Sequence, residues 1–273
     1  IDTYSMIYTF LNLIHNGTYI HSRLPGSPVA ELGIGALAWL GGSKLTNSVN
    51  LILFLSSVTL FPYIFKKNIK LTNYLAFLAL CITSPLLLFE NTHAMDYSWG
   101  LFFFILGSII YSRTKYNFLS VFLFTLSIGS RFIYSLYIIP IFLFNVKEKF
   151  INKLSKRIIF TILTLFFSVL IFTPIWYFNN LSLDLLKTVS GDERAFMQMF
   201  GRFIYKNIMN FGLIQSLIIS LLITKNLANK NKILWIKENN LFSILIIIFL
   251  NMIVFFKLPY EPMYLQISLI SIY

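Results

Sequence analysis

Charged residues and cysteines are scarce in this chain of 273 residues. Asp, Glu, Lys and Arg together make up 12% of the sequence, which is about half of their share in an ordinary soluble domain. Hydrophobic residues make up 57%. This composition argues against a soluble globular protein and indicates an integral membrane protein. The single cysteine, Cys81, lies within an apolar run, which excludes both a disulfide framework and a cysteine metal site.

Acidic residues are especially few. Only 10 Asp and Glu stand against 22 Lys and Arg, which gives a formal net charge of +12. In a soluble chain this excess would suggest nucleic acid as a partner. Here the basic residues lie in short clusters between apolar runs, and the cytoplasmic loops of membrane proteins carry such an excess. We therefore predict membrane lipids, and no nucleic acid, as partners.

Long apolar runs divide the chain into candidate membrane spans, each of which needs about 20 residues. The stretch 117–145 is too long for one span and short for two, and Gly129-Ser130-Arg131 interrupts it. We predict a tight hairpin of two short helices there, with Arg131 at its tip, and about eight crossings in total. The other candidate spans lie at residues 48–65, 72–89, 97–111, 158–178, 208–224 and 241–256.

Three further segments are expected outside these spans. Residues 29–40 are apolar but too short to cross comfortably, and Pro28 and Gly41-Gly42 bound them, so we predict a helix that lies at the membrane interface. Residues 1–27 are polar enough for a loop. Residues 181–207 form a second polar segment with amphipathic character.

The predicted fold class is therefore all-α, a polytopic integral membrane protein with a single transmembrane domain over residues 1–273. A non-cytoplasmic loop with the interfacial helix occupies residues 1–47, and transmembrane helices occupy residues 48–273. The chain begins with Ile and ends in the apolar run 265–273, so we expect a fragment that is truncated at both ends. The number of spans is then a lower bound.

The distribution of charge predicts which side each loop faces. If the loops near 66–70, 113–116, 147–157 and 225–238 share one side, that side holds 14 basic residues and two acids, Glu148 and Glu238. The opposite side keeps eight residues of each sign. The first side should be cytoplasmic. A charge-balanced and chemically varied set of residues on the other side suggests an active site there.

The motifs on the non-cytoplasmic side occur in a recognisable order along most of the chain. They are Asp2, the Arg-x-Pro-Gly-x-Pro element at 23–28, Gly41-Gly42, Asp96 before a Phe-rich span, Gly129-Ser130-Arg131 ahead of Pro140, and residues 259–265 before a late span. This order resembles the GT-C superfamily of polytopic membrane glycosyltransferases, which includes protein O-mannosyltransferases and lipid A aminoarabinose transferases.

The resemblance implies a GT-C-type multi-helix bundle that moves a sugar from a polyprenyl-phosphate or polyprenyl-diphosphate donor. The acceptor would be a glycan, a lipid or a protein, outside the cytoplasm. The resemblance also implies that Asp2 is the catalytic carboxylate. We expect a bacterial inner membrane, with the active site facing the periplasm or exterior, because the loops are compact.

The chemistry of this transfer suggests roles for further residues. Arg131, and then Arg23, are candidates for binding the donor phosphate, because a guanidinium makes planar bidentate contacts with phosphate. Asp96 is a second catalytic candidate. His93 would share a helix face with Asp96 if the span begins early, and the two can orient an acceptor or hold a divalent cation. Metal dependence stays open. Contacts to sugar hydroxyls are assigned to Glu31, Glu261 and Tyr264.

Simpler alternatives stay open as well. Asp2 and Asp96 can be helix caps, Arg131 a snorkelling side chain that marks a turn, and Arg23 a solvated loop charge. The alternative function is a lipid-linked saccharide transporter or flippase, or a polysaccharide polymerase. A transporter should place charges near the middle of several spans, whereas here only Arg131 interrupts one. A structural membrane protein would leave the one-sided polar cluster unexplained.

Overall fold

The chain folds into helices throughout its described part. A computed structural model describes residues 2–22, 26–64, 70–84, 87–88, 91–93, 95–113, 117–144, 154–178, 197–198, 200–202, 205, 241–257 and 266–272. These residues contain no strand, which confirms the all-α class. By its internal contacts the chain divides into two compact units, one of Ile1–Ile64 with Asn91–Ser190 and the other of Phe65–Glu90 with Gly191–Tyr273.

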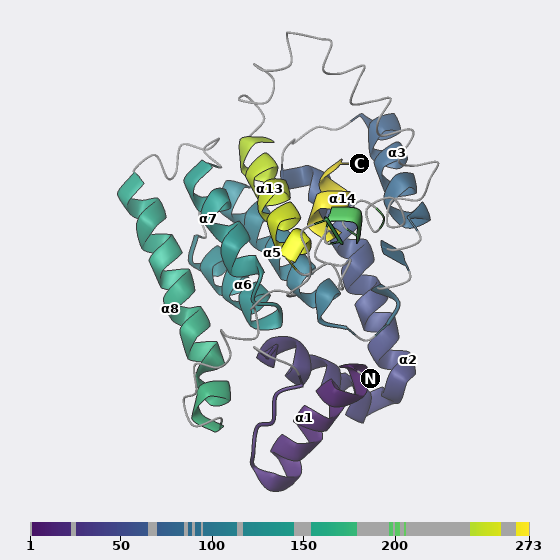
Figure 1. The fold of residues 1–273 in the computed structure, drawn as a ribbon, viewed down its shortest axis with the longest axis vertical. Helices are drawn as coiled ribbons and strands as arrows, with labels where there is room; N and C mark the ends of the chain where they lie inside the picture. Colours follow the sequence, from purple (N-terminus) through teal and green to yellow (C-terminus); the bar gives the residue numbers. More distant parts are fainter. Residues whose placement is uncertain are drawn as a thin grey trace. The chain divides into compact units, whose positions relative to one another are not determined.

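The first unit is a helical bundle (Figure 1). The helix α5 packs against α2 and α6, α1 packs against α2, and α6 and α7 both pack against α8. Two helices, α6 and α7, occupy the stretch predicted as a hairpin, and Arg131 lies in the turn between them. The elements are α1 (Asp2–Asn16), α2 (Pro28–Leu60), η1 (Phe61–Ile64), α5 (Asp96–Arg113), α6 (Asn117–Ser130), α7 (Tyr134–Phe144) and α8 (Leu154–Phe178).

The prediction of a loop over residues 1–27 is wrong for most of that segment, because α1 is a helix of 15 residues. Met6 of α1 is fully buried in a small cluster with Ala30 and Ile34 of α2. Gly35 lets the two helices approach, since a Cβ there would lie 2.1 Å from the Cβ of Phe10. The apolar positions of α1 recur at helical spacing among polar ones, and its overall polarity concealed this pattern.

The helix α2 bends sharply at the glycine pair that the sequence marked as a helix end. Gly42 has φ 65° and ψ −161°, a conformation that is essentially restricted to glycine. The first half of α2 therefore stops where it was predicted to stop. The second half follows without the loop expected before residue 48, and in Figure 1 the two halves run in different directions.

The start of α5 is held closely against the hairpin by small residues. The hydroxyl of Ser127 donates to the backbone carbonyl of Gly100 at 2.8 Å. A Cβ on Gly100 would lie 2.5 Å from Cε2 of Tyr134, whose ring centroid is 5.3 Å from that of Phe104. Such small residues allow backbones to approach in membrane helices, and here they fix the start of α5 beside the α6–α7 turn.

The two ends of α5 carry opposite kinds of residue. Asp96 is its first residue and Arg113 its last, about 25 Å apart along the axis. The guanidinium of Arg113 lies 5.9 Å from the ring centroid of Tyr63. We call Ser27, Glu31, Asp96 and Arg131 the polar end of the bundle, and Arg113, Lys156 and Arg157 the basic end.

In the second unit, α13 (Leu241–Lys257) packs against α14 (Gln266–Ile272), and α3 (Leu71–Thr83) is a shorter helix. The span predicted at 241–256 is confirmed as a helix. The one predicted at 72–89 ends earlier, because Pro85 follows Ser84 and the residue before a proline disfavours helical backbone angles. The span predicted at 208–224 lies outside the described residues.

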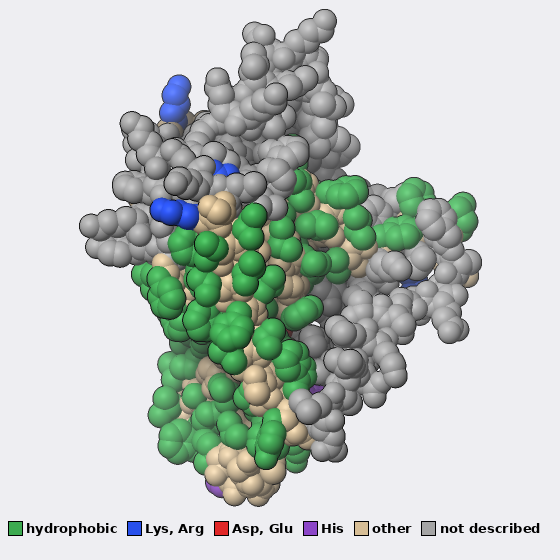
Figure 2. All heavy atoms as spheres, turned by 90° about the vertical axis from the view of Figure 1, so that its left-hand side faces the viewer, with side chains coloured by type: hydrophobic (Ala, Val, Ile, Leu, Met, Phe, Trp, Pro, Cys, Tyr) green, Lys and Arg blue, Asp and Glu red, His purple; other side chains and the backbone are tan. Residues whose placement is uncertain are grey.

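Within the described part, two helical stretches are long and apolar enough to cross a membrane, Pro28–Ile64 and Ser155–Phe178. The helix α8 presents a broad apolar face, and Figure 2 shows hydrophobic side chains covering most of the described surface on that side of the molecule. Its exposed residues include Ile158, Ile162, Leu165, Phe166, Val169 and Leu170. By length and composition alone, the two helices give weak support for membrane association.

Candidate functional site

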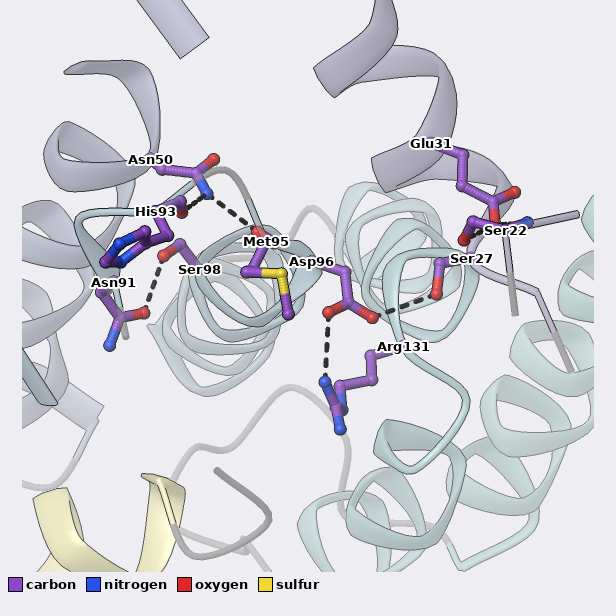
Figure 3. A network of polar contacts seen from close by, with 10 residues as sticks. All are labelled: Ser22, Ser27, Glu31, Asn50, Asn91, His93, Met95, Asp96, Ser98 and Arg131. Carbon is purple, nitrogen blue, oxygen red and sulfur yellow. Dashed lines mark hydrogen bonds and ion pairs between the residues drawn. The ribbon is translucent and has the colours of Figure 1, made fainter. Parts of the chain in front are cut away.

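A buried ion pair forms the centre of the polar end. Nη1 of Arg131 lies 3.1 Å from Oδ1 of Asp96, with 8% and 0% of the two side chains exposed. The hydroxyl of Ser27 donates to the other carboxylate oxygen, Oδ2, at 3.1 Å. Figure 3 shows the carboxylate of Asp96 between these two donors. Three segments that are far apart in the sequence therefore meet at one carboxylate.

Arg131 is held by its turn as well as by its partner. Its backbone amide donates to the carbonyl of Ser127 at 2.9 Å, and its carbonyl accepts from the amide of Tyr134 at 3.1 Å. The guanidinium carbon lies 3.8 Å from the ring centroid of Tyr97, a cation–π distance. A snorkelling arginine would reach for water, so the burial of this side chain favours an internal role.

Both carboxylates of the polar end lie near helix N-termini. Asp96 begins α5 and accepts a hydrogen bond from Ser27, which immediately precedes α2, while Glu31 is in the first turn of α2. The positive end of a helix dipole stabilises negative charge. This placement lowers the cost of burying two carboxylates, which are also the two acidic side chains that the structure describes.

Glu31 fastens the segment before α2 to that helix. Its Oε1 accepts from the backbone amide of Ser22 at 2.9 Å and from the Ser22 hydroxyl at 2.5 Å, and its Oε2 accepts from the hydroxyl of Tyr19. Burial, and then the neighbouring carboxylate, raise the pKa of the Tyr19 hydroxyl well above its ordinary range. The described contacts of Glu31 are therefore those of a structural anchor.

Asn50 holds the turn that leads into Asp96, and the sequence analysis missed it. Its side-chain amide donates to the carbonyls of His93 at 2.6 Å and Met95 at 2.9 Å, while its carbonyl oxygen accepts from Nε1 of Trp99 at 2.8 Å. The residue is fully buried. A lone Asn inside the apolar run 48–65 was the available signal, since a buried amide requires partners.

The bend in α2 allows Ser27 and Asn50 to contact neighbouring residues at the start of α5. In a straight helix, Ser27 and Asn50 would lie about 35 Å apart. Yet Ser27 contacts Asp96 and Asn50 contacts Met95, which are neighbours in the chain. The two halves of α2 therefore reach the same turn from two sides, and the kink at Gly42 brings them there.

His93 takes a different position from the predicted one. It lies in the turn before α5, which begins only at Asp96, so the early start of the span that would place His93 and Asp96 on one helix face is not found. The segment forms a turn because the side chain of Asn50 donates hydrogen bonds to the carbonyls of His93 and Met95. The amide of Met95 also donates to the carbonyl of His93 at 2.9 Å. The side chain of His93 is exposed.

Several predicted site residues lie outside the described part of the chain. Asp2 is the first residue of α1, but its side chain is not among those that the structure describes. Arg23, Glu261 and Tyr264 lie outside the described residues. Among the described residues, no group of three or more His, Cys, Asp or Glu side chains could hold a metal ion. Of the predicted residues, the structure thus brings together Asp96 and Arg131.

Comparison with known proteins adds no assignment. No protein-family model, no curated protein and no solved structure matches this chain. The chemistry of the site therefore has to be argued from its own residues: a guanidinium suited to phosphate, and a carboxylate beside it suited to accepting a proton.

Proposed function

We propose that this protein is a polytopic membrane glycosyltransferase of GT-C type that transfers a sugar from a polyprenyl-phosphate donor to an acceptor hydroxyl at the non-cytoplasmic face. The observation that carries the proposal is the buried pair of Asp96 and Arg131, assembled at one end of an apolar bundle. Ionisable side chains buried in an apolar bundle are costly, and in membrane proteins such residues mark functional sites.

The arrangement of charge along α5 supports the membrane part of the proposal. The helix separates Asp96 from Arg113 by about 25 Å, close to the roughly 30 Å thickness of a bilayer core. The basic end would face the cytoplasm, where Lys and Arg accumulate, and the polar end would face the other side. A bacterial inner membrane is the setting that we propose.

The side chains of the polar end match what the transfer requires. The bond between the anomeric carbon and the phosphate oxygen breaks, and phosphate leaves with the electron pair, which a guanidinium such as Arg131 stabilises. The acceptor oxygen forms the new bond to the anomeric carbon, and its proton passes to a carboxylate. Asp96 is the described group for that role, and Asp2 is the candidate that the family resemblance adds.

The alternative, a lipid-linked saccharide transporter, is less well supported. A transporter binds its substrate near the middle of the membrane between broken helices. The Asp96–Arg131 pair lies instead at the first residue of α5 and in the turn after α6. This position suits a lipid whose phosphate lies at the interface.

The proposal is tested with the full-length protein purified into lipid nanodiscs. Mass spectrometry of the retained lipids should find a polyprenyl phosphate or its glycosylated form, and Arg131→Gln should reduce its amount at least fivefold, whereas Arg113→Gln at the basic end should not. A synthetic polyprenyl-phosphate hexose should then lose its sugar in the presence of an acceptor. Retention of no such lipid would contradict the proposal. Movement of the intact lipid between leaflets, without loss of sugar, would favour the transporter.

A further inference from the structure

We infer that the ion pair between Asp96 and Arg131 is a latch that the phosphate of the lipid carrier opens by competing with Asp96 for the guanidinium. This inference rests on the proposed function, because it assumes a lipid phosphate as ligand. It adds an order of events: the phosphate binds first, and its binding uncovers the carboxylate that the acceptor needs.

The geometry of Arg131 makes the two anions competitors. The Tyr97 ring lies 3.8 Å from the guanidinium carbon and the Asp96 carboxylate contacts Nη1. A phosphate that binds end-on through both terminal nitrogens shares Nη1 with the carboxylate of Asp96 and places a second anion against that nitrogen. The bond to Asp96 must then lengthen or break.

Charge leads to the same conclusion. The side chain of Arg131 is 8% exposed and that of Asp96 fully buried, so water screens their surroundings poorly. A phosphate added beside an intact pair would place a carboxylate and a phosphate on a single guanidinium, and an excess of buried charge is strongly unfavourable. Releasing the carboxylate relieves this excess.

The released carboxylate keeps part of its support. Ser27 donates to Oδ2, whereas Arg131 contacts Oδ1, so a phosphate that displaces the contact with Arg131 does not displace the hydrogen bond from Ser27. The N-termini of α2 and α5 continue to favour the negative charge. Oδ1 is the oxygen that loses its contact with Arg131, and it is then the oxygen that can take the proton of the acceptor.

The experiment measures the affinity of decaprenyl phosphate for the full-length protein in nanodiscs, with decaprenol as the uncharged control. Asp96→Asn removes the competing charge, so it should bind decaprenyl phosphate about tenfold more tightly than the wild type, which corresponds to about 1.4 kcal/mol. A carboxylate that merely positioned Arg131 would give the opposite sign. Unchanged or weaker binding by Asp96→Asn therefore overturns the latch.

Two further variants assign the effect to Arg131. Arg131→Gln should lose binding, and the double variant Asp96→Asn/Arg131→Gln should show no gain over Arg131→Gln alone. Arg113→Gln is the matched control and should leave the affinity within about twofold, because Arg113 lies at the opposite end of α5 from Asp96. A gain that persists in the double variant contradicts the latch.

Folding provides a second measurement. Asp96→Asn removes the carboxylate from a buried cation, so its folded yield should fall. Decaprenyl phosphate added during extraction should restore that yield, and decaprenol should not, because the phosphate replaces the carboxylate beside Arg131. Failure of this rescue also overturns the latch.

The outcomes separate the latch from the proposed function. Wild-type binding of decaprenyl phosphate without a gain in Asp96→Asn overturns the latch and leaves the glycosyltransferase proposal standing. A gain in Asp96→Asn without any sugar transfer by the wild type supports the latch and contradicts the glycosyltransferase. Absence of binding by both proteins contradicts both.

Discussion

The two ends of α5 use scarce charge in different ways. At the polar end, Asp96 and Glu31 are fully buried, and each accepts hydrogen bonds from named donors. At the basic end, Lys156 is exposed and Arg113 is partly exposed over the ring of Tyr63. Lys156 and Arg113 thus keep access to their surroundings, whereas the buried Arg157 of the same end and the charges of the polar end depend on protein partners.

This difference in burial predicts which substitutions of charged residues should destabilise the protein. Burying an ion pair brings a net gain only when its geometry and hydrogen bonds are complete. Removal of a single partner at the polar end should then be costly, and the same chemical change at the partly exposed Arg113 of the basic end should cost little. The predictions that follow test this contrast, beginning with the largest expected effect.

Arg131→Gln should lower the free energy of unfolding by about 3–5 kcal/mol, because it leaves the buried Asp96 carboxylate without its counter-ion. The matched change Arg113→Gln should cost less than about 1 kcal/mol. Denaturant titration of the detergent-solubilised protein measures both. Equal costs for Arg131→Gln and Arg113→Gln would contradict the contrast between the two ends. The double variant Asp96→Asn/Arg131→Gln should recover part of the stability that Arg131→Gln loses, because it no longer buries an unpaired carboxylate.

Asn50→Asp should cost about 3 kcal/mol, since a carboxylate cannot donate to the carbonyls of His93 and Met95 and would face them inside the protein. Trp99→Phe removes only one hydrogen bond to Asn50 and should cost about 1 kcal/mol from that source. Hydrogen exchange should show faster opening at the start of α5 in Asn50→Asp. Unchanged exchange there would mean that Asn50 does not hold the turn.

Gly100→Ala should destabilise the protein by about 2 kcal/mol, because the new methyl group overlaps the ring of Tyr134 and must push α7 away from α5. Gly107→Ala, nearer the middle of the same helix, should cost less than about 1 kcal/mol, since its methyl group would lie 3.1 Å from a ring carbon of Phe124. Thermal unfolding of both variants tests the ranking. The reverse order would show that α7 packs more loosely against the start of α5 than α6 packs against its middle.

Tyr19 gives the smallest effect and a pH dependence. Its raised pKa means that the folded protein holds this proton more tightly than the unfolded chain does. The associated stability is complete below the ordinary tyrosine pKa and is lost as the pH rises above it. Between about pH 10 and 11 the wild type should lose about 1 kcal/mol relative to Tyr19→Phe. Parallel stability curves for the two proteins would contradict the contact with Glu31.

The sequence predicted the elements of the bundle better than their meeting points. Apolar runs located α5 and α8, and the interruption at Gly129-Ser130-Arg131 located the turn that carries Arg131, because local composition decides where a helix can continue. The pairing of Arg131 with Asp96 depends on two helices packing side by side, which no local pattern encodes. The sequence alone indicates separate roles for the two residues, a carboxylate for catalysis and a guanidinium for phosphate.

The contributions of Ser27 and Asn50 were hidden for a related reason. Both belong to α2, and as a straight helix α2 would hold them too far apart to serve one turn. The glycine pair predicts a break in the helix. The angle between the two halves depends on backbone torsions such as those of Gly42, and residue types do not determine these torsions. The helix α1 was missed because a few apolar positions sufficed to bury it against α2.

Because α2 bends at Gly42, a small rotation there would displace the far end of its first half by several ångströms. Ser27 lies 15 residues before the hinge, which places it about 22 Å from the pivot. A rotation of only about 10° at Gly42 would displace Ser27 by about 4 Å, more than the 3.1 Å that separates its hydroxyl from Asp96. The backbone torsion angles of the glycine pair at 41 and 42 thus determine whether Ser27 reaches the carboxylate of Asp96.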